Sequence, residues 1–311
     1  MSSIAILAGS IAAPVLVSYL VERARSAPSA PGQLPWAPEI PVRWVDLDGV
    51  RVRYIVAGDG PTIVLLHTLR TQLDMFQRVI PDLARRFRVY ALDYPGHGYS
   101  DIPRAGYSAE YFISAVARFL DAVGIEDATV VGESIGGTIA LALAARAHPR
   151  VGRVVAVNPY DYDAGRGLRR GSAVANVLLA LARVPVLGET VFRLRHPILE
   201  RKIFEGGVHR AASFPAELAG EMSRVGNRRG HYRAFLSLVR HWPSWEVARQ
   251  EYRRIERPVL LIYGEHDWSS EAERDANRRA IPGNRSLVVR EAGHFLALET
   301  PEALIRALTN P

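Results

Sequence analysis

One short stretch constrains the fold of this chain more than any other, namely Gly132-Glu133-Ser134-Ile135-Gly136. An apolar run precedes it at residues 128–131, and a run of small and apolar residues follows it at residues 137–145. Glycines on both sides of a serine suit a tight strand-to-helix turn that raises the hydroxyl clear of the backbone. Ser134 could act there as a nucleophile, or it could simply cap the helix that follows.

The size of the chain favours one main domain with an insertion. With 311 residues, 48% of them hydrophobic and 23% charged, the composition is that of a globular protein with a large core. The sequence contains no cysteine, which excludes disulfides, thiolate metal sites and a cysteine nucleophile. We also find no motif for a metal, a nucleotide or a flavin, and therefore expect no cofactor.

The N-terminal segment, residues 1–25, contains an uncharged apolar run at residues 4–21. As a helix this run would be about 27 Å long, close to the hydrocarbon thickness of a bilayer, so we predict a single membrane anchor. Arg23 and Arg25 follow it, which would leave the body of the protein on the cytoplasmic side. A cleaved signal segment, which would make the protein secreted, and a soluble packing helix are the alternatives.

Residues 26–41 carry five prolines and read as an extended linker, with the globular body beginning near residue 42. In residues 42–56, polar and apolar residues alternate on both sides of Asp48-Gly49, which predicts two strands joined by a hairpin turn. Further strands are predicted at 62–67, 88–93, 128–131, 151–157, 258–263 and 285–289, with helices at 73–87, 108–123 and 295–308. The alternation of strands with helices along the chain predicts an α/β fold with a mostly parallel sheet flanked by helices.

Between residues 160 and 246 the pattern contains helical stretches and no convincing strand, which predicts an inserted helical cap on a core made of 42–159 and 247–311. Residues 173–187 are apolar on nearly all sides, as expected for a buried helix or for a lid that dips into a membrane. Residues 166–210 hold nine basic and three acidic residues. Such a segment is either a solvated basic face or a surface that attracts an anionic membrane or an acidic substrate. No recognition motif for nucleic acid accompanies it.

Four separated motifs together resemble the α/β-hydrolase superfamily over residues 42–311. They are the strand ending in His67, the loop at residues 93–100, the turn at Ser134, and the late segments 264–267 and 293–295. Their order along the chain, nucleophile then acid then histidine, is the order that this superfamily uses. The resemblance implies a serine hydrolase of the esterase type with a helical cap.

The resemblance assigns a catalytic triad to Ser134, Asp267 and His294. A serine needs a base to take its proton during attack, and His294 fits that role because histidine titrates near neutral pH. The carboxylate of Asp267 would orient the imidazole. Asp161 and Asp163 are alternative acids, because some branches of the superfamily place the acid after the earlier strand, whereas Glu265 is expected to be structural.

The oxyanion hole is predicted from two backbone N–H groups, those of Ile135 and Leu69. The second departs from the family pattern, because relatives usually have glycine where this chain has Thr68. Two neighbours, Arg70 and Gln72, could bind a polar group of the substrate, or could cap the next helix or face water. His67 and His97 are expected to be structural.

The function expected from these residues is hydrolysis of a carboxylic ester, hydrophobic or lipid-like, through an acyl-enzyme. Amide, thioester or carbon–carbon bond hydrolysis by the same triad, and a non-catalytic binding role, are the alternatives. A serine at position 134 argues against dehalogenase and epoxide-hydrolase chemistry, which would use an aspartate there. Trp242, Trp245 and Trp268 could line the pocket or belong to the core.

Overall fold

The computed structural model describes residues 3–310, with side chains from residue 12 onward. Its strands form one sheet in the order β1-β2-β3-β5-β4-β6-β7-β8-β9. Their bounds are β1 (Gln33–Leu34), β2 (Ala37–Leu47), β3 (Val50–Ala57), β4 (Thr62–Leu66), β5 (Arg88–Leu92), β6 (Ala128–Glu133), β7 (Val151–Val157), β8 (Val259–Gly264) and β9 (Arg285–Val289). In this order, the neighbouring strands from β5 through β4 to β9 are parallel. Strands β1, β2 and β3 are antiparallel to their neighbours.

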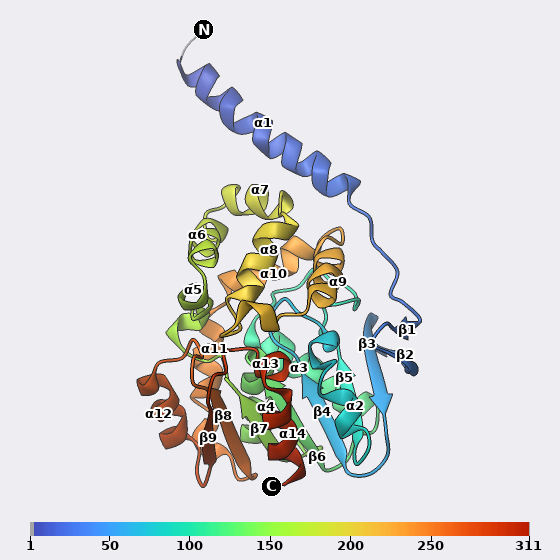
Figure 1. Ribbon diagram of the computed structural model, residues 1–311. Coiled ribbons are helices and arrows are strands. Elements are labelled where there is room, and N and C mark those ends of the chain that lie inside the picture. The colour runs from blue at the N-terminus through green and yellow to red at the C-terminus, as the bar shows by residue number, and fades with distance from the viewer. Residues whose placement is uncertain (1–2, 311) are drawn as a thin grey trace.

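Helices cover both faces of this sheet, with α13 and α14 in front and α4 behind in the view of Figure 1. The core helices are α2 (Ile80–Leu83), α3 (Ala109–Ala122), α4 (Ile135–Ala145), α12 (Glu271–Ala280), α13 (Leu296–Glu299) and α14 (Pro301–Thr309). Strand β4 shows how apolar side chains exclude water from both faces of the sheet. Its side chains alternate, so that Val64 and Leu66 pack with α3 and α4, while Ile63 and Leu65 pack with α2, α13 and α14. The predicted α/β fold is therefore confirmed.

Prolines shortened two of the predicted helices. The helix expected at 73–87 is a 3₁₀ turn (Leu73–Phe76) followed by the short α2, because Pro81 can occupy only the first turn of a helix. The helix expected at 295–308 is divided into α13 and α14 at Pro301 for the same reason. The predicted linker also ends early, since β1 and β2 begin at Gln33 and Ala37. Pro35, Pro38 and Pro41 are tolerated there at the edge of the sheet.

The predicted cap region is helical. It contains α5 (Leu168–Gly171), α6 (Ala173–Ala182), α7 (Leu187–Arg193), α8 (Pro197–Glu205), α9 (Ala216–Gly226), α10 (His231–Arg240) and α11 (Pro243–Arg249). Figure 1 shows α5 to α10 stacked beyond the carboxyl ends of the parallel strands. The helix predicted over 173–187 is interrupted between α6 and α7, where Pro185 stands. Helix α11 packs against α3 and α4, so it belongs to the core and the cap ends before it.

Helix α1 (Ser3–Ala24) extends away from the body and packs against α7 at its carboxyl-terminal end (Figure 1). The predicted anchor at residues 4–21 lies within it, but the side chains before residue 12 are outside the described part. Among the residues that the structure describes, no helix combines the length and the apolar character needed to cross a bilayer. The anchor and the cytoplasmic location of the body stay predictions.

Candidate active site

Ser134 lies at the turn between β6 and α4, at the carboxyl end of the central parallel strands. Its backbone angles, φ 61° and ψ −121°, are sparsely populated by residues other than glycine. A β-carbon on Gly132 would lie 2.0 Å from the Gly136 carbonyl oxygen, and one on Gly136 would lie 2.2 Å from the Leu66 carbonyl oxygen. Both glycines are therefore needed for the close approach of the turn to α4 and β4. The Ser134 side chain caps no N–H of α4, so the helix-cap interpretation does not hold in this structure.

The structure brings Ser134, His294 and Asp267 together in one hydrogen-bonded chain. The Ser134 Oγ lies 2.8 Å from His294 Nε2, and His294 Nδ1 lies 2.5 Å from Asp267 Oδ1. All three side chains are buried. Burial alone would raise the pKa of Asp267, but the charge and hydrogen bond of His294, with hydrogen bonds from Ser269, hold that pKa below its ordinary value. Asp267 therefore stays ionised and holds the imidazole with Nε2 facing the serine.

The other candidate acids make their hydrogen bonds elsewhere. Asp161 is buried and accepts hydrogen bonds from Tyr252 Oη at 3.0 Å and from Asn277 Nδ2 at 3.0 Å. Burial raises its pKa to about 6. Asp163 forms ion pairs with Arg166, Arg169 and Arg170 at the base of the cap. Glu265 is exposed and accepts a hydrogen bond from the Glu291 backbone N–H.

The histidine loop is held by Asn158, which the sequence did not single out, and by Trp268, which the sequence offered only as a pocket or core residue. Asn158, which follows β7, donates from Nδ2 to the carbonyl oxygens of Gly293 (3.1 Å) and His294 (2.9 Å). Its Oδ1 accepts from the Gly264 N–H at 2.9 Å, so this side chain connects the acid loop to the histidine loop. Trp268 stacks on the imidazole of His294 with ring centroids 3.7 Å apart. The positive φ of Asn158, 45°, suits asparagine, but the sequence contains no motif that signals this role.

The two predicted oxyanion donors lie on different elements, Ile135 at the start of α4 and Leu69 on the loop after β4. Ile135 is the first residue of α4, so its N–H has no carbonyl partner within the helix. Leu69 lies on the buried loop after β4. Thr68 replaces the usual glycine there, and its carbonyl oxygen accepts hydrogen bonds from Thr71 Oγ1 (2.9 Å) and His67 Nδ1 (2.7 Å). These bonds fix the path of the loop that carries Leu69.

Burial lowers the pKa of His67 and of His97 to about 3, so both imidazoles are neutral. The Nε2 of His67 accepts from the Tyr94 N–H at 3.3 Å while its Nδ1 donates to Thr68. This agrees with the structural role expected for His67, which ties together the loops after β4 and β5.

A family model described as alpha/beta hydrolase fold matches residues 61–301, a range that contains the serine, the acid and the histidine in the observed order. The chain belongs to the alpha/beta hydrolase family.

Similar proteins of known name differ in activity. The chain is 27% identical over 283 residues to the carboxylesterase YbfK of Bacillus subtilis, covering 86% of each chain. It is also 27% identical over 276 residues to haloalkane dehalogenase 2 of Mycobacterium tuberculosis, covering 86% of this chain and 93% of that one. The crystal structure of Cfl2 from Burkholderia cenocepacia superposes with a TM-score of 0.78 at 24% identity, covering 91% of this chain and 99% of that chain.

Other relatives are matched only in part, and this chain spans less than half of their length. The chain is 41% identical over 121 residues to the dihydrolipoyllysine-residue acetyltransferase component of the acetoin cleaving system of Cupriavidus necator. That alignment covers 39% of this chain and spans about a third, 32%, of the relative.

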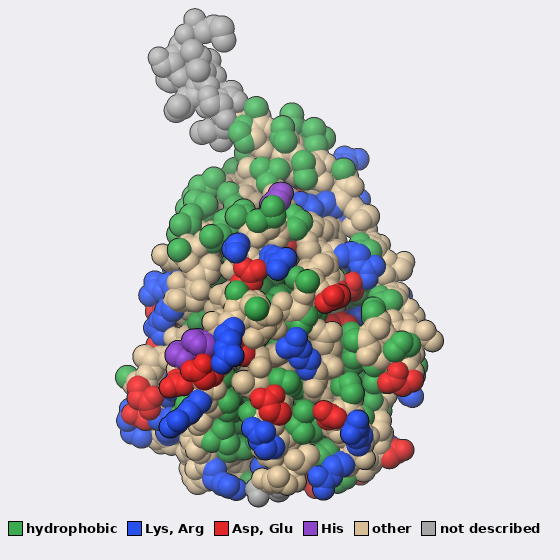
Figure 2. Space-filling model, in the orientation of Figure 1, with side chains coloured by type: hydrophobic (Ala, Val, Ile, Leu, Met, Phe, Trp, Pro, Cys, Tyr) green, Lys and Arg blue, Asp and Glu red, His purple; other side chains and the backbone are tan. Residues whose placement is uncertain are grey.

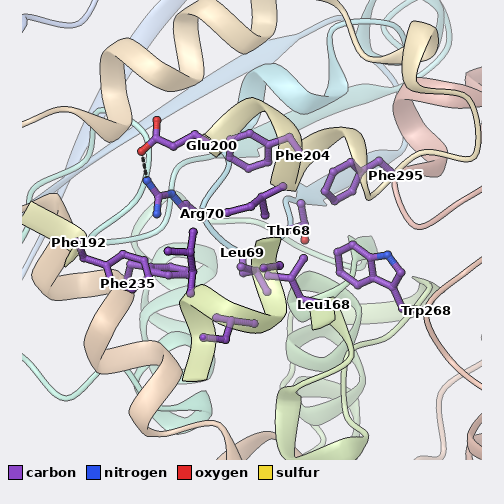
Figure 3. Close-up of a pocket in the computed structure, with 14 residues that line it drawn as sticks. Thr68, Leu69, Arg70, Leu168, Phe192, Glu200, Phe204, Phe235, Trp268 and Phe295 are labelled. Atoms are coloured by element: carbon purple, nitrogen blue, oxygen red, sulfur yellow. Dashed lines mark hydrogen bonds and ion pairs between the residues drawn. The ribbon is translucent and has the colours of Figure 1, made fainter. Parts of the chain in front are cut away.

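In this alpha/beta hydrolase a pocket lies between the loop after β4 and the cap (Figure 3). Leu69 and Trp268 line it from the core, and Trp268 is also the residue stacked on His294. Side chains of α6, α7, α8 and α10 line the cap side, and most of them are aliphatic or aromatic. Of the other tryptophans, Trp245 is fully buried and stacks on Phe112 in the core, and Trp242 is buried beside a separate surface hollow.

One ion pair interrupts the apolar lining. Arg70 from the core loop pairs with Glu200 of α8, and both side chains are almost fully buried (Figure 3). The guanidinium of Arg70 also lies over the Phe235 ring, 4.8 Å from its centroid. Gln72 instead donates to Asp74 Oδ2 at 2.7 Å, away from the pocket. Arg70 therefore lines the pocket and joins the cap to the core, whereas Gln72 does neither.

Among the described residues, one group of side chains could hold a metal ion, namely His209, His266 and Glu291. All three are exposed, and their candidate ligand atoms lie within 4.8 Å of one another. Glu291 already pairs with Arg210 at 3.0 Å, which would compete with a cation. This group shares no residue with the hydrogen-bonded chain at Ser134.

Proposed function

We propose that this protein is a serine hydrolase that cleaves a carboxylic ester with an apolar portion through an acyl-enzyme intermediate. The observation that carries the proposal is the hydrogen-bonded chain from Asp267 through His294 to Ser134, next to an apolar pocket. The carboxylesterase relative supports an ester as the substrate.

In the first half of the reaction the Ser134 Oγ attacks the ester carbonyl carbon while His294 Nε2 takes the hydroxyl proton. The carbonyl oxygen becomes an oxyanion and accepts hydrogen bonds from the backbone N–H groups of Ile135 and Leu69. Asp267 stabilises the imidazolium without taking its proton. As the tetrahedral intermediate collapses, the carbon–oxygen bond to the alcohol breaks and His294 returns the proton to the departing oxygen.

The second half of the reaction releases the acid. A water molecule gives a proton to His294 Nε2 and attacks the acyl carbon, and a second tetrahedral intermediate forms over the same N–H donors. Ser134 then leaves as the alcohol and regains its proton from the imidazolium. No other reactant than water is required.

The nucleophile distinguishes this proposal from that suggested by the dehalogenase relative. Dehalogenation would require a carboxylate that displaces halide. The nucleophile position here holds instead a serine hydroxyl that is hydrogen-bonded to a histidine. Serine chemistry on a carbonyl therefore agrees better with the residues present.

A series of p-nitrophenyl esters of increasing acyl length tests the proposal. We expect kcat/KM to rise from acetate to medium-length chains, because each methylene placed in the pocket contributes about 0.8 kcal/mol. The Ser134→Ala variant should lose activity by at least about 10³-fold, while Ser286→Ala, on the exposed edge of β9, should be unchanged. Retained activity in Ser134→Ala would refute serine catalysis, and a preference for acetate alone would refute the apolar substrate.

A further inference from the structure

The outer surface of the cap exposes an unusual number of large apolar side chains. They lie at the ends and outer faces of α6, α7 and α8, and we call this surface the cap tip: Val177, Val184, Val186, Leu187, Ile198 and Leu199. Ile198 and Val177 are 64% and 60% exposed. Figure 2 shows hydrophobic side chains gathered over this end of the molecule. A contiguous apolar surface in contact with water is unfavourable and marks a place where something else covers it.

The carboxyl-terminal part of α1 enlarges this apolar surface. Buried polar contacts hold α1 beside α7: Glu22 accepts from Arg195 Nη1 at 2.7 Å and from the Gly230 N–H at 2.6 Å. With the helix fixed in this way, Leu16 and Leu20 remain more than half exposed. The apolar side of α1 therefore continues the cap tip rather than covering it.

Cationic side chains accompany this surface. Most basic residues of the cap have carboxylate partners. Among those that form no salt bridge to a described residue, Arg183 follows α6 and Arg193 ends α7, and Arg23 near the end of α1 forms none either. Of the acids between α6 and α8, Glu189 is paired with Arg240 and Glu200 with Arg70. An apolar surface with unpaired cations beside it has the character of an interface for anionic lipid headgroups with acyl chains beneath them.

Helix α8 connects this surface to the pocket. Its outer side exposes Ile198 and Leu199, while Ile203 and Phe204 line the pocket. Leu199 lies one turn before Ile203 on the same helix, so an apolar side chain of the cap tip adjoins one of the pocket. A lipid-like molecule leaving a bilayer at the cap tip would meet apolar side chains along this helix.

We propose that the cap tip and the exposed side of α1 form a docking surface for an anionic lipid bilayer, from which the substrate enters the pocket past α8. The delivery of substrate rests on the proposed ester hydrolysis, whereas the docking itself does not. A second copy of the chain on the same apolar surface is the competing occupant.

The absence of cysteine allows a direct test, because one introduced cysteine can be labelled alone. Ile198→Cys and Val177→Cys are prepared in the Ser134→Ala background, and each is labelled with an environment-sensitive fluorophore. Val247→Cys is the matched control, since Val247 is 57% exposed but lies on α11 against the core. The full-length proteins are mixed with phosphatidylcholine vesicles containing phosphatidylglycerol, with or without nitroxide-labelled lipid.

We expect blue-shifted emission and quenching by the nitroxide lipid at positions 198 and 177, and neither at 247. Protein that binds vesicles while the labels at 198 and 177 stay in water would overturn the proposal, because α1 alone would then account for binding. A blue shift that appears without vesicles and follows a monomer–dimer equilibrium by light scattering would also overturn it. Equal binding to vesicles of phosphatidylcholine alone would refute the role of the cations.

A second measurement separates docking from catalysis. Ile198→Glu should lower the vesicle partition coefficient roughly tenfold, because it removes the burial of one large aliphatic side chain, and Val247→Glu should not. Hydrolysis of a short soluble ester should be equal in Ile198→Glu and the wild type. Unchanged partition in Ile198→Glu would overturn the docking surface, whereas absent soluble-ester activity in the wild type would overturn the proposed function instead.

Discussion

Replacing Asn158 by glycine tests how the acid and histidine loops are held in register. The change removes three buried hydrogen bonds, to the carbonyl oxygens of Gly293 and His294 and from the Gly264 N–H. Glycine adopts the positive φ of 45° without strain, so any loss of stability in the variant is due to the missing asparagine side chain. At about 1 kcal/mol for each bond, we expect the free energy of unfolding to fall by about 3 kcal/mol.

The same substitution should lower kcat toward the preferred ester by about 10- to 100-fold with little change in KM, because His294 and Asp267 lose their mutual alignment. Urea denaturation and steady-state kinetics measure the two effects. Asn176→Ala, on the exposed side of α6, is the control and should change neither. A loss of stability below about 1 kcal/mol together with an unchanged kcat would refute this role of Asn158.

Three further substitutions test other parts of the account. Burial raises the pKa of Glu133 to about 8, so between pH 4.5 and 8 the unfolded chain has released a proton that the folded chain keeps, and stability falls as pH rises. Glu133→Gln should remove that decline, worth up to about 5 kcal/mol, and an unchanged slope in urea denaturations at several pH values would contradict it. Glu200→Gln leaves Arg70 buried without its anionic partner and should cost about 3 kcal/mol or more in the same assay; a loss within error of the wild type would mean that the pair does not hold the cap. Gly136→Ala places a β-carbon 2.2 Å from the Leu66 carbonyl oxygen, so we expect little folded protein by circular dichroism, and a stable, active variant would contradict the packing of the turn.

The sequence predicted most of the core because each signal was local. Glycines around Ser134 are required by contacts within a few residues, and the apolar run of β6 needs only its own composition to be read as a buried strand. The mostly parallel sheet and the helical cap followed from the alternation of such runs. The interruptions at Pro81, Pro185 and Pro301 could also have been read from the sequence, since proline is disfavoured inside a helix.

Other features depend on pairings between distant residues, which no local pattern contains. Asn158 acquires its role only when β7 lies beside β8 and brings residues 264 and 294 within reach. The pairing of Arg70 with Glu200 likewise requires the cap to fold back over the loop after β4. Strand β1 and the beginning of β2, residues 37–41, were missed because prolines at 35, 38 and 41 are typical of linkers, although the edge of a sheet accepts them.

Covalent labelling tests the central claim, the nucleophilic role of Ser134, most directly. Folded wild-type protein is incubated with a fluorophosphonate probe, and the intact mass and the modified peptide are determined by mass spectrometry. The account predicts one adduct on Ser134, absent from Ser134→Ala and strongly slowed in His294→Ala, because the probe reacts with a serine activated by a histidine. No adduct on the folded wild-type protein, or equal labelling of Ser134→Ala, would contradict the account.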